Sequence, residues 1–139
     1  MKTATIRNNV TVKESNQERI AFAQTIDFQP LFDHTCSFSK VNCEFSTPII
    51  EVNRAGDVYI SFKSEDIASQ TGPFAAILKE CRFENFGCRV SENEETGVFR
   101  FHGSVTIQYE HINGGFNGMD VIYAVYSEND GWAFDDAGA

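Results

Sequence analysis

Apolar and polar residues alternate along much of this chain, and the longest alternating run covers residues 97–110. Five large apolar side chains share one face of that run: Phe99, Phe101, Val105, Ile107 and Tyr109. Period-two alternation of this length predicts a long strand with one face on a core and the other in water. Gly103 interrupts the apolar face, so we expect a bend or bulge there and a curved sheet.

Two further segments extend the predicted sheet. Residues 58–62 alternate after a turn at residues 54–56, which predicts a hairpin whose first arm lies near residues 49–52. Residues 121–126 are apolar on both faces and follow a glycine-rich loop at residues 113–118. Because glycine accepts positive φ angles, this loop is expected to connect the long strand to residues 121–126 as a hairpin.

The N-terminus and the middle of the chain carry two different patterns. Apolar residues alternate within residues 6–12 and again within residues 20–28, which predicts two N-terminal strands in a hairpin. In residues 72–81, Pro73 lies near a helix start and apolar side chains recur at helical spacing, so we expect the main helix there. The recurring side chains are Phe74, Ile77, Leu78 and Cys81.

These elements predict an α+β fold: a curved, mostly antiparallel sheet of about six or seven strands with one main helix packed on one face. A chain of 139 residues has the length of a single domain. We assign residues 1–130 to that domain and residues 131–139 to an acidic C-terminal tail. No apolar run reaches the ~18 residues of a membrane span, and no secretion signal is recognisable, so a soluble cytoplasmic protein is expected.

The four cysteines lie in two similar octets, residues 36–43 and 81–88. The gaps between the paired cysteines are longer than the ~2–4 residues of a zinc knuckle, and thiols in a reducing cytosol mostly stay reduced. We therefore expect free cysteines that pack as small apolar residues. Zinc binding and disulfide formation are the alternatives that the sequence leaves open.

Candidate catalytic patterns lack the partners that catalysis requires. His34 lies two residues before Cys36, but no third group for a thiolate mechanism is identifiable. His102 and His111 fall on opposite faces of the predicted strand, and the Glu94-Glu95 pair lies in a turn. We expect a binding protein rather than an enzyme, without cofactor or metal.

Charge is distributed unevenly along the chain. The formal net charge is −9, and all eleven lysines and arginines occur at or before Arg100, whereas residues 101–139 carry six of the acids. Such a field repels nucleic acid and attracts basic proteins. Two aromatic residues between the C-terminal acids are typical of interface anchors. The predicted partner-binding residues are Glu110, Asp120, Glu128, Asp130, Trp132, Phe134, Asp135 and Asp136.

The resulting hypothesis is a non-enzymatic acidic binding protein with a basic protein partner and no direct contact with nucleic acid or membrane. Its narrower form is a phage or mobile-element inhibitor, of the anti-CRISPR or antirestriction type, that blocks a nucleic-acid enzyme by partly mimicking nucleic-acid charge. One alternative is a small apolar ligand held in a pocket between sheet and helix, lined by Phe99, Phe101, Tyr109 and Tyr123. Another alternative is a structural subunit of a larger assembly, which would use exposed sheet edges.

Overall fold

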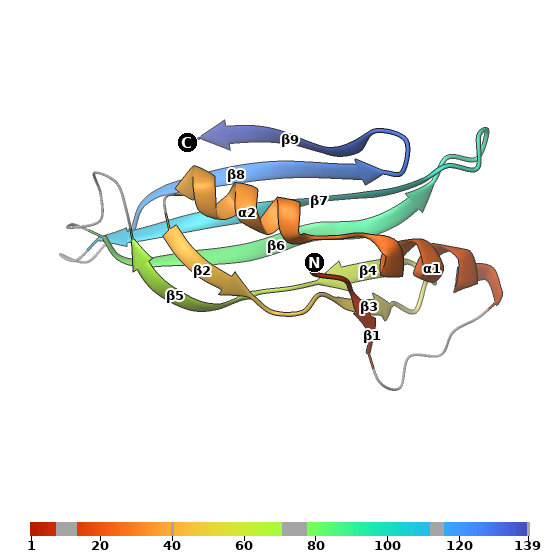
Figure 1. Cartoon of the computed structure of the whole chain (residues 1–139), viewed down its shortest axis with the longest axis horizontal. Coiled ribbons are helices and arrows are strands. Elements are labelled where there is room, and N and C mark those ends of the chain that lie inside the picture. Colours follow the sequence, from red (N-terminus) through yellow and green to blue (C-terminus); the bar gives the residue numbers. More distant parts are fainter. Residues whose placement is uncertain (8–13, 40, 71–77, 112–115, 139) are drawn as a thin grey trace.

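A computed structural model describes residues 1–7, 14–39, 41–70, 78–111 and 116–138 of the chain (Figure 1). Its elements are, in chain order, β1 (Thr5–Ile6), the 3-10 helix η1 (Glu14–Asn16), α1 (Gln17–Thr25), α2 (Gln29–Ser39), β2 (Val41–Phe45), β3 (Ile49–Val52), β4 (Val58–Ser61), β5 (Ser64–Gln70), β6 (Leu78–Glu92), β7 (Phe99–His111), β8 (Phe116–Ser127) and β9 (Gly131–Gly138).

Seven strands form one sheet in the order β1-β3-β4-β6-β7-β8-β9. Every neighbouring pair in it is antiparallel except β1 with β3, and β2 and β5 form a separate antiparallel pair. The predicted α+β fold with a curved, mostly antiparallel sheet is confirmed. Two of the three predicted hairpins are also present, as β3 with β4 and as β7 with β8.

Two described helices, rather than the one expected, cover one face of this sheet. Both α-helices lie on the same side of the long strands (Figure 1). Side chains from the two layers meet in one core, where Phe28, Phe101 and Ile107 have an exposed fraction of 0%. Neither of the described α-helices is long and apolar enough to cross a membrane.

The predicted N-terminal hairpin is wrong, because residues 17–25 form α1. Ile20 and Phe22 fit a strand by their spacing, but α1 also buries Ala23, one helical turn after Ile20. Because the large apolar residues alternate as in a strand, the small Ala23 was not recognised as part of a buried helical stripe. Most of the first expected strand, residues 8–13, lies outside the described residues.

Helix α2 follows α1 directly and was not predicted. Pro30 lies in its first turn, where the missing N–H of proline costs no hydrogen bond. Asp27 precedes the helix, and its Oδ1 accepts a hydrogen bond from the backbone N–H of Gln29 at 3.0 Å, as N-terminal capping side chains do. The buried side chains of α2 fall one turn apart along one face: Leu31, Phe32, Thr35 and Ser39.

The main helix expected at residues 72–81 is wrong at its C-terminal end, because residues 78–81 begin strand β6. Residues 71–77 lie outside the described residues. β6 pairs with β7 from Leu78 opposite His111 to Glu92 opposite Phe99, and this ladder satisfies backbone groups over nearly the whole strand. Pairing with the long strand β7 therefore outweighed the short helical pattern in residues 72–81.

The irregularity predicted at Gly103 is present, but its additional residue belongs to the neighbouring strand, where Gly87 and Cys88 lie opposite Gly103. The register of β6 against β7 shifts between Phe86 and Arg89, where Gly87 has a φ of 60°. A Cβ built on Gly103 would lie 2.7 Å from the Cα of Cys88. Glycine is therefore required at this position because the bulged backbone of β6 approaches so closely.

The C-terminal residues are part of the sheet rather than a separate tail. β9 pairs with β8 from Ser127 opposite Gly131 to Asp120 opposite Gly138, and it forms one edge of the sheet. The indole Nε1–H of Trp132 donates a hydrogen bond to the backbone oxygen of Asp27 at 2.9 Å. The boundary expected at residue 130 therefore coincides with the turn between two paired strands.

Candidate functional site

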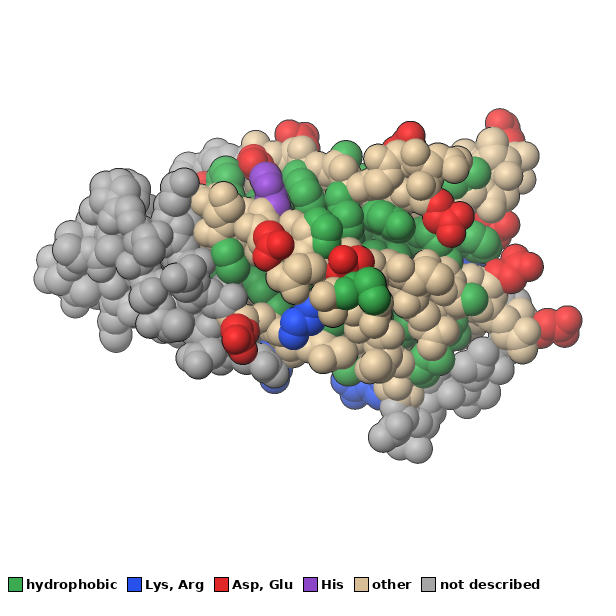
Figure 2. Space-filling view, in the orientation of Figure 1, with side chains coloured by type: hydrophobic (Ala, Val, Ile, Leu, Met, Phe, Trp, Pro, Cys, Tyr) green, Lys and Arg blue, Asp and Glu red, His purple; other side chains and the backbone are tan. Residues whose placement is uncertain are grey.

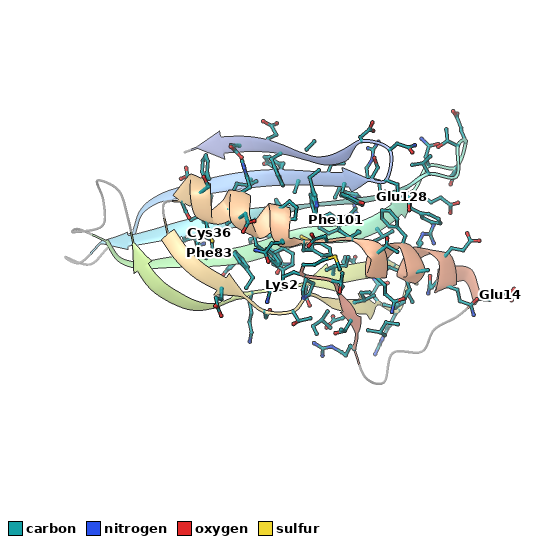
Figure 3. All side chains as sticks on the ribbon, viewed as in Figure 1. Lys2, Glu14, Cys36, Phe83, Phe101 and Glu128 are labelled. Atoms are coloured by element: carbon teal, nitrogen blue, oxygen red, sulfur yellow. The ribbon has the colours of Figure 1, made fainter. Side chains whose placement is uncertain are left out.

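Acidic side chains gather at the end of the molecule where the β6–β7 and β8–β9 turns approach α1 (Figure 2). Figure 3 marks Glu14 and Glu128, which come from distant parts of the sequence, at this end. All of these carboxylates are exposed, and we call them the acidic end: Glu14, Glu18, Glu92, Glu94, Glu95, Glu128 and Asp130. The fold therefore concentrates charge that the sequence distributes over three segments.

The β6–β7 turn is held rigidly by its own hydrogen bonds. Oδ1 of Asn93 accepts the backbone N–H groups of Glu95 at 2.9 Å and Thr96 at 3.1 Å, as asparagine does in turns. The N–H of Gly97 donates to the carbonyl of Asn93 at 2.7 Å, and Gly97 supplies the positive φ of 72° that the turn requires. Glu94 and Glu95 therefore project into solvent from a fixed backbone.

The β8–β9 turn is built in a similar way. Oγ of Ser127 accepts the N–H of Asp130 at 3.3 Å, and Gly131 takes a positive φ of 68°. Ser127 is buried, whereas Glu128 and Asp130 are exposed. The strand order places these two hairpin turns at the same end of the sheet, about two strand spacings or ~10 Å apart.

The third part of the acidic end comes from the start of α1. Glu14 lies in η1 and Glu18 in the first turn of α1, where the helix dipole favours negative charge. Arg19 lies 3.7 Å from a carboxylate oxygen of Glu92, so α1 and β6 are linked at this end. Both side chains of this pair are about one-third exposed, and the pair neutralises one of the seven carboxylates only in part.

Two depressions border the acidic end. One has a volume of about 420 Å³, lies between the two turns, and has Glu92, Arg100 and Asp130 in its wall. The other, of about 460 Å³, lies between α1 and the same turns and is lined in part by Phe22 and Phe99. The surface here is therefore hollowed enough to accept side chains of a partner.

Only two of the predicted partner-binding residues, Glu128 and Asp130, belong to the acidic end. Asp120 is half-buried on β8. The adjacent residues Asp135 and Asp136 are exposed on β9, and because side chains alternate along a strand they point to opposite faces of the sheet. The predicted acids therefore do not form a single patch.

Three other predicted residues lie away from the acidic end or point inward. Glu110 is near the end of β7 that is remote from the β6–β7 turn, and its side chain lies outside the described part of the structure. Trp132 packs in the core, with its ring centroid 5.7 Å from that of Phe28. Phe134 stacks on His34 with a centroid separation of 4.3 Å. The two aromatic residues hold β9 against the helical layer.

Five acids of the acidic end are not among the residues predicted to bind a partner. The signal available in the sequence was weak, because a turn rich in glutamate is ordinary on any soluble surface. Strand pairing, rather than local composition, decides that the turns meet α1. The added residues are Glu14, Glu18, Glu92, Glu94 and Glu95.

Among the described cysteine and histidine side chains, Cys88 and His102 have shifted pKa values. Burial raises the pKa of the Cys88 thiol to about 11, which opposes nucleophilic reactivity at neutral pH. Burial also lowers the pKa of His102, and the positive charges of Arg89 and Arg100 add to this effect. Within the described ranges, no group of three or more His, Cys, Asp or Glu side chains is arranged to hold a metal ion.

The residues proposed to line an apolar pocket are divided between the two faces of the sheet. Phe101 is fully buried against Phe28 and Trp132. Tyr123 is 52% exposed and alternates with the buried Ile122 and Ala124, so it lies on the opposite face. Phe101 and Tyr123 therefore do not line a common cavity.

Chemically, the acidic end presents a concentration of negative charge. Seven carboxylates come from the end of β6, two hydrogen-bonded hairpin turns and the start of the helical segment, next to depressions that can accept side chains. Guanidinium and ammonium groups are the protein cations that such carboxylates bind. No protein-family model matches this chain, and neither a curated protein nor a solved structure matches it.

Proposed function

We propose that this protein is a non-catalytic binding protein whose acidic end docks against a basic surface of another protein. The convergence of seven exposed carboxylates from three separate segments carries the proposal. Clustered charge of one sign raises the local concentration of an oppositely charged partner and speeds encounter. The rigid turns favour specific binding, because less conformational freedom is lost when the partner docks.

A narrower form of the proposal concerns the kind of partner. Nucleic-acid enzymes carry lysine and arginine in grooves that bind phosphates, and a compact set of carboxylates offers the same charge to those grooves. An inhibitor that competes with nucleic acid for such a groove fits the acidic end. The net charge of −9 supports this form, because it opposes direct binding of the protein to nucleic acid.

The test is capture of partners from a nuclease-treated bacterial lysate by three tagged proteins: the wild type, an acidic-end variant and a control variant. The acidic-end variant carries Glu94→Gln, Glu95→Gln, Glu128→Gln and Asp130→Asn. The control variant removes the same charge from exposed or partly exposed positions elsewhere, by Asp33→Asn, Glu44→Gln, Glu51→Gln and Asp57→Asn.

We expect wild type and control to retain the same basic protein at low salt and to release it at high salt. The acidic-end variant should bind it at least about tenfold more weakly, with a flatter dependence of log affinity on log salt. Displacement of the partner by an added DNA or RNA duplex would support the narrower form. Equal capture by both variants would refute a role for the acidic end.

A further inference from the structure

The sheet has a second face that no described helix or strand covers. Side chains on it alternate with the core-facing ones along β6, β7 and β8. Phe86 and Tyr123 are each 52% exposed on this side, and Met119 is 38% exposed, so three of the five exposed large hydrophobic residues described lie here. We call this surface the open face. Apolar residues gathered on one face in this way mark an interaction site more often than scattered ones do.

Strand pairing arranges the open face in rows that cross the sheet. The central row contains Phe86 of β6, Ser104 of β7, Tyr123 of β8 and Asp135 of β9. The next row toward the acidic end contains Arg89, His102 and Val125. The next row in the other direction contains Glu84, Thr106 and Val121. The two exposed aromatic residues of the central row, Phe86 and Tyr123, thus lie between a row with a cation and a row with an anion.

We propose that the open face is a dimer interface that packs on the open face of a second copy of this chain. The twofold axis lies along the central row, perpendicular to the strands. This operation places the central rows of the two copies on each other, because a row that lies along the axis is its own image. Phe86 then faces Phe86 of the second copy, and Tyr123 faces Tyr123 of the second copy. It also places Arg89 of each copy opposite Glu84 of the second copy, and Val125 opposite Val121 of the second copy.

Charge selects this arrangement over the one with the axis parallel to the strands. A parallel axis would set Arg89 over the apolar residues of β8 and would bring the two acidic ends together. The perpendicular axis pairs opposite charges and places the acidic ends at opposite ends of the dimer, where their repulsion is screened by distance and salt. Face-to-face packing of two sheets with nearly aligned strands is a common way to bury a sheet face.

The size of the open face suits a stable dimer. Strand spacings of ~4.8 Å and a rise of ~3.3 Å per residue make the part from β4 to β9 roughly 25 Å by 30 Å. That is of the same order as the ~800 Å² that each partner buries in a stable interface. Among the described residues of the open face, Asp135 is unfavourably placed, since it faces Asp135 of the second copy at the rim.

The decisive test is sedimentation velocity of the full chain from about 1 to 500 µM, with charge-reversed variants. Wild type should show a monomer–dimer equilibrium. Arg89→Glu and Glu84→Arg should each raise the dissociation constant at least tenfold, and the double variant Arg89→Glu/Glu84→Arg should return it to within about threefold of wild type. Asp135→Asn should strengthen the dimer. Circular dichroism and melting temperature of each variant show whether it is folded.

A wild type that stays monomeric at every concentration would overturn the inference, and so would a dimer that Phe86→Ser and the charge reversals leave unchanged. A monomer that instead binds a single-stranded oligonucleotide through Phe86 would assign the face to nucleic acid and overturn it as well. The dimer does not rest on the proposed function. The acidic-end variant should therefore dimerise like wild type, which separates failure of one proposal from failure of the other.

Discussion

Asp27 joins three parts of the molecule that are far apart in the sequence. Its Oδ1 accepts the backbone N–H of Lys2 at 2.9 Å as well as that of Gln29, and its carbonyl accepts the indole N–H of Trp132. The N-terminal segment, the start of α2 and the edge strand β9 are thus tied to one residue. Loss of this side chain would leave two backbone donors without their carboxylate partner.

Asp27 should make stability depend on pH. Burial alone would raise the pKa of this carboxyl, but the hydrogen bonds from Lys2 and Gln29 and the N-terminal positive charge lower it below its ordinary value of 3.8. The ionised form is therefore favoured in the folded state, and its contribution is present above the unfolded pKa and is lost as the pH falls through the folded pKa.

Replacement Asp27→Asn keeps an acceptor but removes the charge. We expect it to lower the free energy of unfolding by about 1 kcal/mol at pH 7, because hydrogen bonds to a charged acceptor are stronger than those to a neutral one. Urea denaturation from about pH 7 to pH 2 should show the difference from wild type shrinking below about pH 4. A difference that stays constant over this range would exclude ionisation of Asp27 as its cause.

At the scale of elements, β9 is the one whose position contradicts its composition. Its acids suggest a solvated tail, yet Trp132 and Phe134 face the helical layer and the backbone is paired with β8 along its length. Aromatic burial and the strand ladder together outweigh the dispersed charge. β9 should therefore unfold with the rest of the domain.

The single tryptophan makes this prediction measurable, because Trp132 alone reports the docking of β9 by fluorescence. Denaturation followed by tryptophan fluorescence and by far-UV circular dichroism should give coincident transitions. Trp132→Phe, which keeps most ring contacts but loses the hydrogen bond to Asp27, should cost about 1 kcal/mol. A fluorescence transition at lower denaturant than the dichroism transition would show that β9 detaches independently.

The sequence predicted the strands of this fold better than its helices, for reasons visible in particular residues. In β7 and in the β3–β4 hairpin, apolar and polar residues alternate with the two-residue period of a strand, and no helical pattern competes with it. In α1, the spacing of Ile20 and Phe22 is that of a strand, and only the small Ala23, three residues after Ile20, indicates a helix. At the start of β6, Leu78 fits a helical stripe, but pairing with β7 decides the outcome. Such long-range pairing is absent from any local window of sequence.

For the whole molecule, the sequence gives the sign of the charge but not its location. Counting along the chain pointed to the C-terminal quarter, whereas the fold collects acids from η1, α1 and two hairpin turns. Two of the eight predicted residues, Glu128 and Asp130, belong to that set because their turn happens to lie at the same end. Composition therefore identifies the class of partner, and only topology identifies the surface.

Clustering of like charge also destabilises the folded state. Carboxylates held close together repel one another in the folded state and separate on unfolding, so removing four of them should stabilise the protein. At low ionic strength we expect the acidic-end variant to melt about 3–5 °C above wild type, which corresponds to about 1 kcal/mol for a chain of this size. The control variant removes dispersed charges and should gain clearly less.

Salt provides the internal check on this explanation. Because the Debye length falls to about 3 Å at 1 M salt, the advantage of the acidic-end variant should largely disappear there. Differential scanning fluorimetry of the three proteins from about 10 mM to 1 M NaCl measures both effects in one series. If the control variant gained as much as the acidic-end variant, net charge alone would explain the result and the carboxylates would not act as a cluster. A larger, salt-sensitive gain for the acidic-end variant would show by stability alone that the four replaced carboxylates lie in a shared negative field, independently of any partner.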